Sequence, residues 1–310
     1  MRGACILAVD VGGTSIKLAL ISPEGRYVEG TFRATPVNSM GGREEILGPF
    51  IGLLKEGLSD ARERGLEVRA IGLAVPGPFD LERGVSLMRH KFSSLYGLSL
   101  REVIAQRLGL EEGLPIIFKL DSWAFVVGEA WRGAARGCKR VIGITLGMGL
   151  GSAFMVNGRI VTEGPGVPPE GWLWNLPYEG GILEDRVSRR GIIRRYKELT
   201  GEELDVREIA LRGLRGDRNS LRVFEEVGRI LGRCLRPIAM EFKPDCIVFG
   251  GRISKAFDLF KGPLMRELRG IRGLKKVAPS PQIDLSPLYG ITKMTLEELS
   301  RGSRHRRARF

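Results

Sequence analysis

The sequence predicts an α/β protein whose two similar lobes, each a mixed sheet with helices, flank a central cleft. The first observation is a repeat: a strand, a glycine turn and a second strand occur from residue 5 and again from residue 140. The second is that further apolar strands alternate with amphipathic helical segments after each copy. The third is length, because 310 residues suffice for two domains with separate cores.

Patterns of apolar residues predict the elements of the first lobe. Residues 5–10, 15–22 and 27–33 are expected to form an antiparallel meander of three strands joined by two turns. Apolar residues at helical spacing in 43–64 predict an amphipathic helix. The remaining elements expected in this lobe are a strand over 69–75, a helix over 98–108 and a strand over 115–120.

The second lobe begins with a helix expected over 122–132 and then repeats the meander. Its three strands are expected over 140–145, 152–156 and 159–163. The later elements are helices over 184–199, 220–242 and 254–269, with a strand over 245–249 before the last helix.

The repeat also predicts the domain organisation. We expect an N-terminal lobe over 1–120 and a C-terminal lobe over 121–290. The chain after residue 287 is weakly periodic, and a closing helix is expected within 291–300. The last ten residues, 301–310, hold five arginines and no acidic residue, which predicts a disordered basic tail.

Composition argues against several classes of protein. The apolar run before Asp10 is too short for a signal peptide, and the longest uncharged stretch, 141–158, contains five glycines, so it fits a strand–turn–strand better than a membrane span. Four scattered cysteines and two histidines argue against a disulfide framework and against a zinc site. We therefore expect a cytoplasmic protein with no membrane association.

The net charge of +13 arises from 49 basic and 36 acidic residues. A basic tail could contact nucleic acid, but no zinc-finger spacing, RNP signature or basic zipper accompanies it. We therefore expect a solvated tail and no nucleic-acid partner.

The turn between the first two strands carries groups suited to phosphate. Gly12 and Gly13 let the backbone turn tightly with its N–H groups directed to a common point, Thr14 adds a hydroxyl and Lys17 a cation. Asp10, at the strand end, suits a magnesium ion held through water. The alternative is a two-glycine hairpin with a surface lysine, and this motif alone does not decide between them.

The corresponding turn of the second lobe contains Thr145, Gly147 and Gly149. Its alternating glycines leave amides for phosphate oxygens, but a strand follows rather than a helix, so it is neither a Walker loop nor a Rossmann fingerprint. One such loop is weak evidence. Two of them in repeated lobes could grip the phosphates of a nucleotide from both sides.

Two further positions follow apolar strands. Asp121 could accept a proton from a substrate hydroxyl as a general base, and the alternative is a structural N-cap of the following helix. Gly250 and Gly251 end a strand and could pass close to a flat ligand or merely form a turn.

These motifs, in this order, resemble those of the sugar kinases of the ROK family, which have the actin-like ATPase (ribonuclease H-like) fold. Residues 10–17 resemble the family's D-x-G-G-T-x-x-K phosphate loop, and residues 74–80 resemble its G-x-P-G-x-x-D segment. Asp121 with 128–131 resembles the segment that carries the catalytic aspartate. The second phosphate loop and the adenosine segment of the family correspond to 145–149 and 247–251.

The resemblance implies an ATP-dependent sugar kinase, similar to glucokinases and hexokinases, that uses Mg²⁺ and phosphorylates a sugar hydroxyl. It implies Asp121 as the general base and Asp10 as the residue that holds Mg²⁺. Gly77, Glu170 and Glu184 fall at sugar-binding positions of the family. The residues implied to contact ATP or its phosphates are Asp10, Gly12, Gly13, Thr14, Lys17, Thr145, Gly147, Gly149, Gly250 and Gly251. A homodimer would fit the habit of the family.

The sequence also departs from the family pattern. Leu120 stands where the family has asparagine, and Leu173 stands where its G-E-x-G-H segment has histidine. The cysteine-rich zinc knuckle is absent, and in its place the sequence has Trp172, Trp174 and Tyr178. These residues could stack on a sugar ring, and the alternative is that they pack in the core or in a lid. The alternative function is therefore a catalytically degenerate regulatory protein of the same fold that binds a sugar or a nucleotide.

Overall fold

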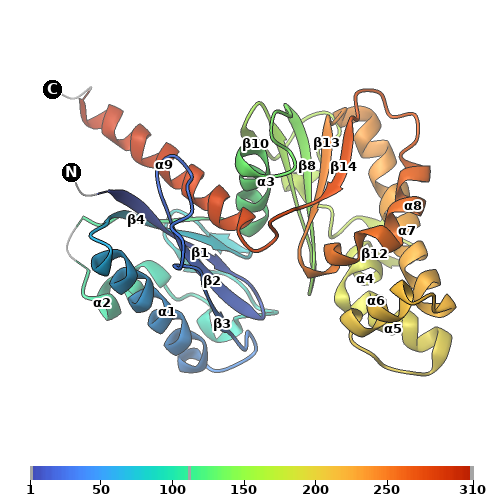
Figure 1. Cartoon of the computed structure of the whole chain (residues 1–310), viewed down its shortest axis with the longest axis horizontal. Coiled ribbons are helices and arrows are strands. Elements are labelled where there is room, and N and C mark those ends of the chain that lie inside the picture. The colour runs from blue at the N-terminus through green and yellow to red at the C-terminus, as the bar shows by residue number, and fades with distance from the viewer. Residues whose placement is uncertain (1–2, 111–112, 308–310) are drawn as a thin grey trace. The chain divides into compact units, whose positions relative to one another are not determined.

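The computed structural model describes residues 3–110 and 113–307 and divides into two compact units (Figure 1). Unit 1 comprises Met1–Arg132 and Asp284–Phe310, and unit 2 comprises Gly133–Ile283. The chain therefore leaves unit 1 after residue 132 and returns to it at residue 284, whereas the sequence predicted one crossing near residue 120 and a second lobe that extends to 290.

The sheet of unit 1 has five strands in the order β3-β2-β1-β4-β7. The first three strands of the chain pair antiparallel, while β4 and β7 join the other edge in parallel. β1 and β4 are almost continuously apolar, as is typical of strands that are covered on both faces of a sheet. The strands are β1 (Ala4–Val11), β2 (Ser15–Ile21), β3 (Arg33–Pro36), β4 (Glu67–Val75) and β7 (Ile116–Leu120).

The sheet of unit 2 repeats this topology, with the order β10-β9-β8-β13-β14. Here too a meander of three antiparallel strands is extended by two parallel strands. The strands are β8 (Arg140–Leu146), β9 (Leu150–Val156), β10 (Arg159–Val161), β13 (Cys246–Gly250) and β14 (Lys276–Pro279). The predicted α/β class, with two similar lobes of mixed sheet and helices, is confirmed.

Alternate side chains of β1 separate the two faces of the unit 1 sheet, because successive residues of a strand point to opposite sides. Leu7 and Val9 pack in the core beneath helix α1 (Arg43–Glu63), to which α2 (Leu100–Leu108) also contributes. Ala8 packs on the other face with residues of α3 (Asp121–Arg132) and α9 (Ser286–Arg307), so these two helices cover the face opposite α1 (Figure 1).

Helices α3 and α9 touch backbone to backbone through two glycines, which explains the position of the domain boundary. A Cβ atom on Gly128 would lie 1.8 Å from the carbonyl oxygen of Ser286, and one on Gly290 would lie 1.7 Å from that of Ala124. The buried Glu129 side chain accepts a hydrogen bond from the hydroxyl of Ser286 at the same crossing. This packing holds α3 in unit 1, although it was expected to begin the second lobe.

Helix α9 extends further than the sequence predicted. The closing helix expected within 291–300 is part of it, and residues 301–307 continue the helix instead of forming a disordered tail. The rest of the predicted tail, 308–310, lies outside the described residues.

In unit 2, long helices pack on the sheet and bury one face each. The longest is α7, whose Val223, Val227, Leu231 and Leu235 lie at intervals of four residues and pack in the core. The helices are α4 (Glu184–Val187), α5 (Arg189–Thr200), α6 (Val206–Leu214), α7 (Arg218–Phe242) and α8 (Phe257–Glu267), with the 3-10 turn η3 (Arg252–Ala256) before α8.

Some predicted elements differ from the observed ones. The strand expected over 27–33 is wrong: Tyr27 forms a single bridge with Ile21, Gly30 has a positive φ of 76°, and β3 starts at Arg33. The helix expected over 184–199 breaks at Ser188, whose backbone is extended. The short elements α6 and β14 were not predicted. In the described part of the chain, no helix is long and apolar enough to cross a membrane.

Candidate active-site residues

The first phosphate loop of the prediction is the β1–β2 turn of unit 1. Asp10 and Lys17 are direct cross-strand partners, one pair before the last pair that precedes the turn. Gly13 and Thr14 form its tip, where Thr14 is exposed, and the Gly12 amide donates to the carbonyl of Ser15 at 3.0 Å. The turn therefore places the exposed residue Thr14 near a carboxylate and an ammonium group, while the Gly12 amide is used inside the turn.

Lys17 forms ion pairs with two carboxylates. Its Nζ lies 3.4 Å from Asp10 Oδ2 and 3.1 Å from Asp284 Oδ1. Burial disfavours the charged form of Lys17, but the two carboxylates outweigh burial and raise its pKa. Burial raises the pKa of Asp10, which is 8% exposed, while the ammonium group of Lys17 opposes that increase. Asp284 was not predicted, because nothing near it in the sequence suggests a contact with the β1–β2 turn.

Asp121 is the first residue of α3 and directly follows β7. Its Oδ1 accepts a hydrogen bond of 2.7 Å from the amide of Ser122, the next residue, whereas the usual N-cap accepts from an amide two or three residues further along. Burial raises the pKa of this carboxyl to about 6; Lys91 opposes the shift, and the negative charge of Asp10 adds to it. A carboxylate with such a pKa is suited to accept a proton near neutral pH.

The fold brings Asp10, Gly77 and Asp121 to the same edge of the unit 1 sheet. Strands β1, β4 and β7 are parallel neighbours, and these residues lie at or just beyond their carboxyl ends. Ligands of open α/β sheets bind at this edge. The structure therefore groups the predicted base, the predicted magnesium residue and one predicted sugar position.

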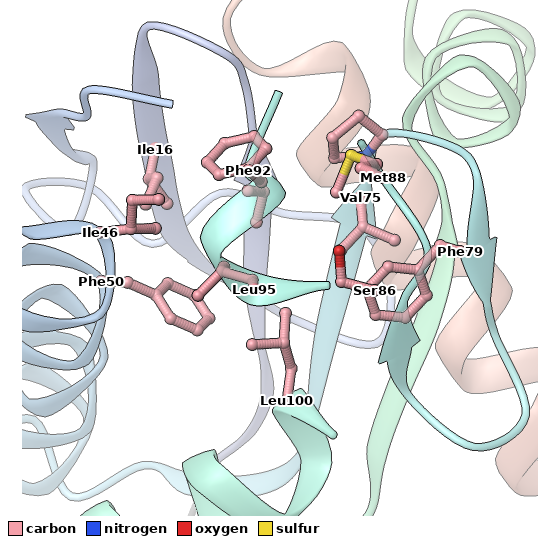
Figure 2. A pocket seen from close by; sticks show the side chains of 12 residues that line it. Ile16, Ile46, Phe50, Val75, Phe79, Ser86, Met88, Phe92, Leu95 and Leu100 are labelled. Carbon is pink, nitrogen blue, oxygen red and sulfur yellow. The ribbon is translucent and has the colours of Figure 1, made fainter. Parts of the chain in front are cut away.

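A small apolar cavity lies under this edge, between the sheet and α1 (Figure 2). Val75, Phe79, Met88 and Phe92 are among its walls, and its volume of about 20 Å³ has room for about one water molecule. The hydroxyl of Ser86 faces this apolar space and, among the described residues, has no hydrogen-bond partner. The cavity is too small for a sugar, so it belongs to the core that supports the site.

In unit 2, the predicted phosphate and adenosine residues lie together. Thr145 at the end of β8 pairs in register with Gly250 at the end of β13. Gly251 has φ +76°, and a Cβ atom there would lie 2.2 Å from the carbonyl oxygen of Leu146, so only glycine fits against the end of β8. The β8–β9 turn with Gly147 and Gly149 follows immediately.

Glu184, predicted to bind sugar, contacts the second phosphate loop directly. Its Oε2 accepts a hydrogen bond of 2.8 Å from the amide of Leu150, the residue after Gly149. Its own amide donates to the carbonyl of Trp174 at 3.1 Å. Glu184 therefore joins the glycine turn to the segment around Trp174.

That segment is anchored to β9. The hydroxyl of Ser152 donates to the carbonyl of Gly171 at 2.7 Å and accepts from the amide of Leu173 at 2.9 Å. Leu173 is 1% exposed and packs in the unit 2 core, so the position where the family has histidine holds a core residue here. Glu170, with a positive φ of 58°, is exposed one residue before Gly171.

Two indole rings flank Leu173 and face outward. Trp172 and Trp174 are 38% and 36% exposed, and their ring centroids lie 6.1 Å apart. Each residue is therefore partly covered and partly exposed, so its ring lies neither wholly in the core nor wholly in solvent.

The candidate residues divide evenly between the units. Unit 1 contains Asp10, Gly12, Gly13, Thr14, Lys17, Gly77 and Asp121, and unit 2 contains Thr145, Gly147, Gly149, Glu170, Glu184, Gly250 and Gly251. Among the described residues, no cluster of three histidine, cysteine or acidic side chains could hold a metal ion by itself. Besides Asp284, the sequence reasoning missed Lys91, the cation that acts on Asp121.

Comparison with known proteins identifies the family. A glucokinase of Thermotoga maritima is 26% identical over 321 residues, which cover 95% of this chain and 98% of that protein. An N-acetyl-D-glucosamine kinase of Pectobacterium atrosepticum is 27% identical over 270 residues, covering 81% of this chain and 85% of that protein.

A ROK family glucokinase from Streptomyces griseus, solved in complex with glucose and AMPPNP, has the same fold. The TM-score is 0.74 at 22% identity, over 94% of this chain and 98% of that one. The model of the ROK family matches residues 6–271, so this chain belongs to the ROK family.

Proposed function

We propose that this protein is an ATP-dependent kinase that phosphorylates a hydroxyl group of a sugar. The observation that carries the proposal is the position of Asp121, a carboxyl with a pKa raised to about 6, at the sheet edge that also bears Asp10 and the first glycine turn. The relatives named glucokinase and N-acetyl-D-glucosamine kinase support sugar as the class of acceptor.

Asp121 is the general base of this proposal. As the sugar oxygen attacks the γ-phosphorus in line, an O–P bond forms, the bond from the γ-phosphorus to the bridging oxygen breaks, and ADP leaves. The hydroxyl proton passes to the Asp121 carboxylate. Because phosphoryl transfer depends mainly on positioning and on neutralising charge, one base and a set of fixed donors suffice.

The donor set beside the first loop fits a magnesium ion. Mg²⁺ prefers carboxylate oxygens and is usually held by one or two of them together with phosphates and water. Asp10 and Asp284 both direct oxygens toward one cation, the ammonium group of Lys17, so their surroundings already accept positive charge. We assign Asp10 to the ion, which neutralises phosphate charge when bound, and Lys17 to a phosphate oxygen.

The remaining roles follow the motifs. Gly12, Gly13 and the Thr14 hydroxyl are the proposed phosphate contacts of unit 1, and Thr145, Gly147 and Gly149 are those of unit 2. Because the amides of Gly12 and Gly147 donate within their own turns, to the carbonyls of Ser15 and Gly149, we assign the amides of Gly13 and Gly149 as the backbone donors to phosphate. Gly250 and Gly251 are the proposed contacts of the adenosine. The close approach of Gly251 to β8 supports this role, because the backbone there carries no side chain that would keep a flat ligand away. The proposed sugar contacts are Gly77, Glu170 and Glu184.

The decisive experiment compares the wild type with Asp121→Asn in an assay that couples ADP release to a signal, over a panel of hexoses and amino sugars. General-base help is worth about 10²–10⁴ in rate, so turnover should fall at least about 100-fold while ATP binding is retained. Glu56→Gln, which removes a carboxylate on α1 that pairs with Arg33, is the control and should keep full activity. Unchanged turnover in Asp121→Asn would contradict the assignment.

The burial of Leu173 favours a second candidate, because a core leucine cannot hydrogen-bond a sugar hydroxyl. That candidate is a regulatory protein of the same fold that binds a sugar or a nucleotide without turnover. Nucleotide binding by calorimetry, with no ADP released for any acceptor in the panel, would support it over the kinase.

We further propose a cytoplasmic location and a homodimer. None of the four cysteines, all of which lie in the described part of the chain, is in a disulfide, which suits a reducing compartment. The homodimer rests on the family habit, and analytical ultracentrifugation tests it. We propose no nucleic-acid partner; salt-dependent binding to DNA that is lost when residues 301–310 are removed would contradict this.

A further inference from the structure

The second phosphate loop is held by one short stretch of chain. The carboxylate of Glu184 accepts from the amide of Leu150 at 2.8 Å, and the amide of Arg189 donates to the carbonyl of Gly147 at 2.9 Å. Both ends of the glycine turn are therefore tied to residues 184–189. Between these ties the turn is open, since Met148 at its tip is 50% exposed.

The contact between Glu184 and the loop requires a glycine at position 149. A Cβ atom at Gly149 would lie 2.6 Å from Oε2 of Glu184, closer than carbon and oxygen can approach. No positive φ is involved at this position, so the carboxylate itself is what excludes a side chain there. The contact is thus built from both partners, a glycine on the loop and an acid on α4.

Glu184 is also hydrogen-bonded to the segment around Trp174, one of the residues predicted as able to stack on a sugar ring. Its amide donates to Trp174, and the neighbouring Leu173 is held by Ser152 on β9. Only Oε2 of the carboxylate contacts the loop; within the part of the chain that the structure describes, Oε1 accepts no hydrogen bond. Oε2 therefore accepts a hydrogen bond from the second phosphate loop, whereas Oε1 can accept one from a ligand.

We propose that Glu184 is a positioning residue that couples acceptor binding to nucleotide binding. An acceptor hydroxyl that donates to Oε1 restricts the carboxylate to the rotamer in which Oε2 holds Leu150. The loop is then ordered before the nucleotide arrives, so each ligand binds more tightly in the presence of the other. This inference rests on the proposed contact between Glu184 and the sugar.

The test measures AMPPNP affinity by calorimetry, with and without acceptor, in variants at position 184. Glu184→Ala removes the hydrogen bond to Leu150, and AMPPNP should bind about tenfold more weakly even without acceptor. Glu184→Gln keeps an oxygen that can accept from Leu150, so its affinity without acceptor should stay within about twofold of the wild type. Asp185→Asn, which loses only the exposed ion pair with Arg190, is the matched control and should leave AMPPNP binding unchanged.

Gly149→Ala examines the same contact from the loop side. Its Cβ should displace the carboxylate and weaken AMPPNP binding about as much as Glu184→Ala does. In the double variant Gly149→Ala/Glu184→Ala the clash is absent, so the two effects should not add. Additive effects would contradict a direct contact, and this result does not depend on turnover.

Two outcomes overturn the inference. If Glu184→Ala binds AMPPNP like the wild type and only the acceptor KM rises, Glu184 serves the acceptor alone while the kinase proposal stands. If acceptor does not tighten AMPPNP binding in the wild type, there is no coupling for Glu184 to transmit. A wild type that binds AMPPNP but turns over no sugar would instead defeat the proposed function, and the comparison without acceptor would still decide the loop contact.

Discussion

Lys17 and Asp284 form an ion pair of 3.1 Å that joins the β1–β2 turn to the point where the chain re-enters unit 1. Lys17 is nearly buried, whereas the Asp284 side chain is 50% exposed. Lys17 is also paired with Asp10, so one ammonium group serves two carboxylates. A phosphate that approaches Lys17 therefore meets the negative charge of the half-exposed Asp284 side chain.

Asp284→Asn should strengthen nucleotide binding. The change removes a carboxylate that repels phosphate and competes for Lys17. Because Asp284 is half exposed, we take the range for exposed pairs, about 0.2–1 kcal/mol, which is up to about fivefold in affinity. Calorimetry with AMPPNP in low salt measures the effect. The effect should shrink at roughly 0.5 M salt, because salt at that concentration screens the interaction between exposed charges. Glu297→Gln, which removes the ion pair with Lys293 on the same helix, is the control. Weaker binding in Asp284→Asn would instead make Asp284 part of the nucleotide site.

The rate should depend on pH through Asp121. Its pKa is raised to about 6 by burial, and only the ionised carboxylate accepts a proton. kcat/KM should therefore rise tenfold per pH unit below about 6 and reach a plateau above it. A pH–rate profile of the wild type measures this rise on the acid side. The residual activity of Asp121→Asn should no longer show the rise. A flat wild-type profile between pH 5 and 7, roughly the range around that pKa, would remove Asp121 from the rate-determining proton transfer.

Lys91→Met should move this acid limb to higher pH. The positive charge of Lys91 favours the ionised form of Asp121, so its loss raises the pKa of that carboxyl further. Well above pH 7 the carboxylate is ionised in both proteins, and their rates should agree within about twofold. Arg89→Met is the matched control, because Arg89 contacts Tyr96. A shift to lower pH in Lys91→Met would contradict the electrostatic relationship.

Gly128→Ala should destabilise unit 1 severely. Its Cβ would lie 1.8 Å from the carbonyl oxygen of Ser286, and backbone cannot yield as a flexible side chain can. Overpacking typically costs about 1–3 kcal/mol, and we expect a loss of about 3 kcal/mol or more in the free energy of unfolding measured with urea.

Gly52→Ala on α1 is the counterpart of that variant. A Cβ atom at Gly52 meets nothing within 4 Å, so the substitution should stabilise the helix by about 0.5–1 kcal/mol. If Gly128→Ala proved as stable as Gly52→Ala, helices α3 and α9 would not be in backbone contact.

Much of the fold was predictable because its signals are local. The glycine turns at Gly12 and Gly147, each between two apolar strands, identified the repeated meander, and apolar spacing identified α1. Asp10, Asp121 and Glu184 were predicted as site residues from their motifs, and their roles stay predictions. The strand expected over 27–33 was wrong because its apolar residues were read as a strand although Gly30 turns the chain.

The two-lobed α/β class and the family could be predicted from the sequence, because each copy of the strand–glycine–strand pattern and each family motif is a short run of residues. The phosphate-binding residues stay predictions from those motifs. The packed structure was needed to show that α3 belongs to unit 1, that Asp284 pairs with Lys17 and that Glu184 accepts a hydrogen bond from Leu150. These contacts join segments far apart along the chain, where no periodicity or motif records the partner. The geometry of backbone approach and buried charge that selects them exists only once the sheets and helices have packed.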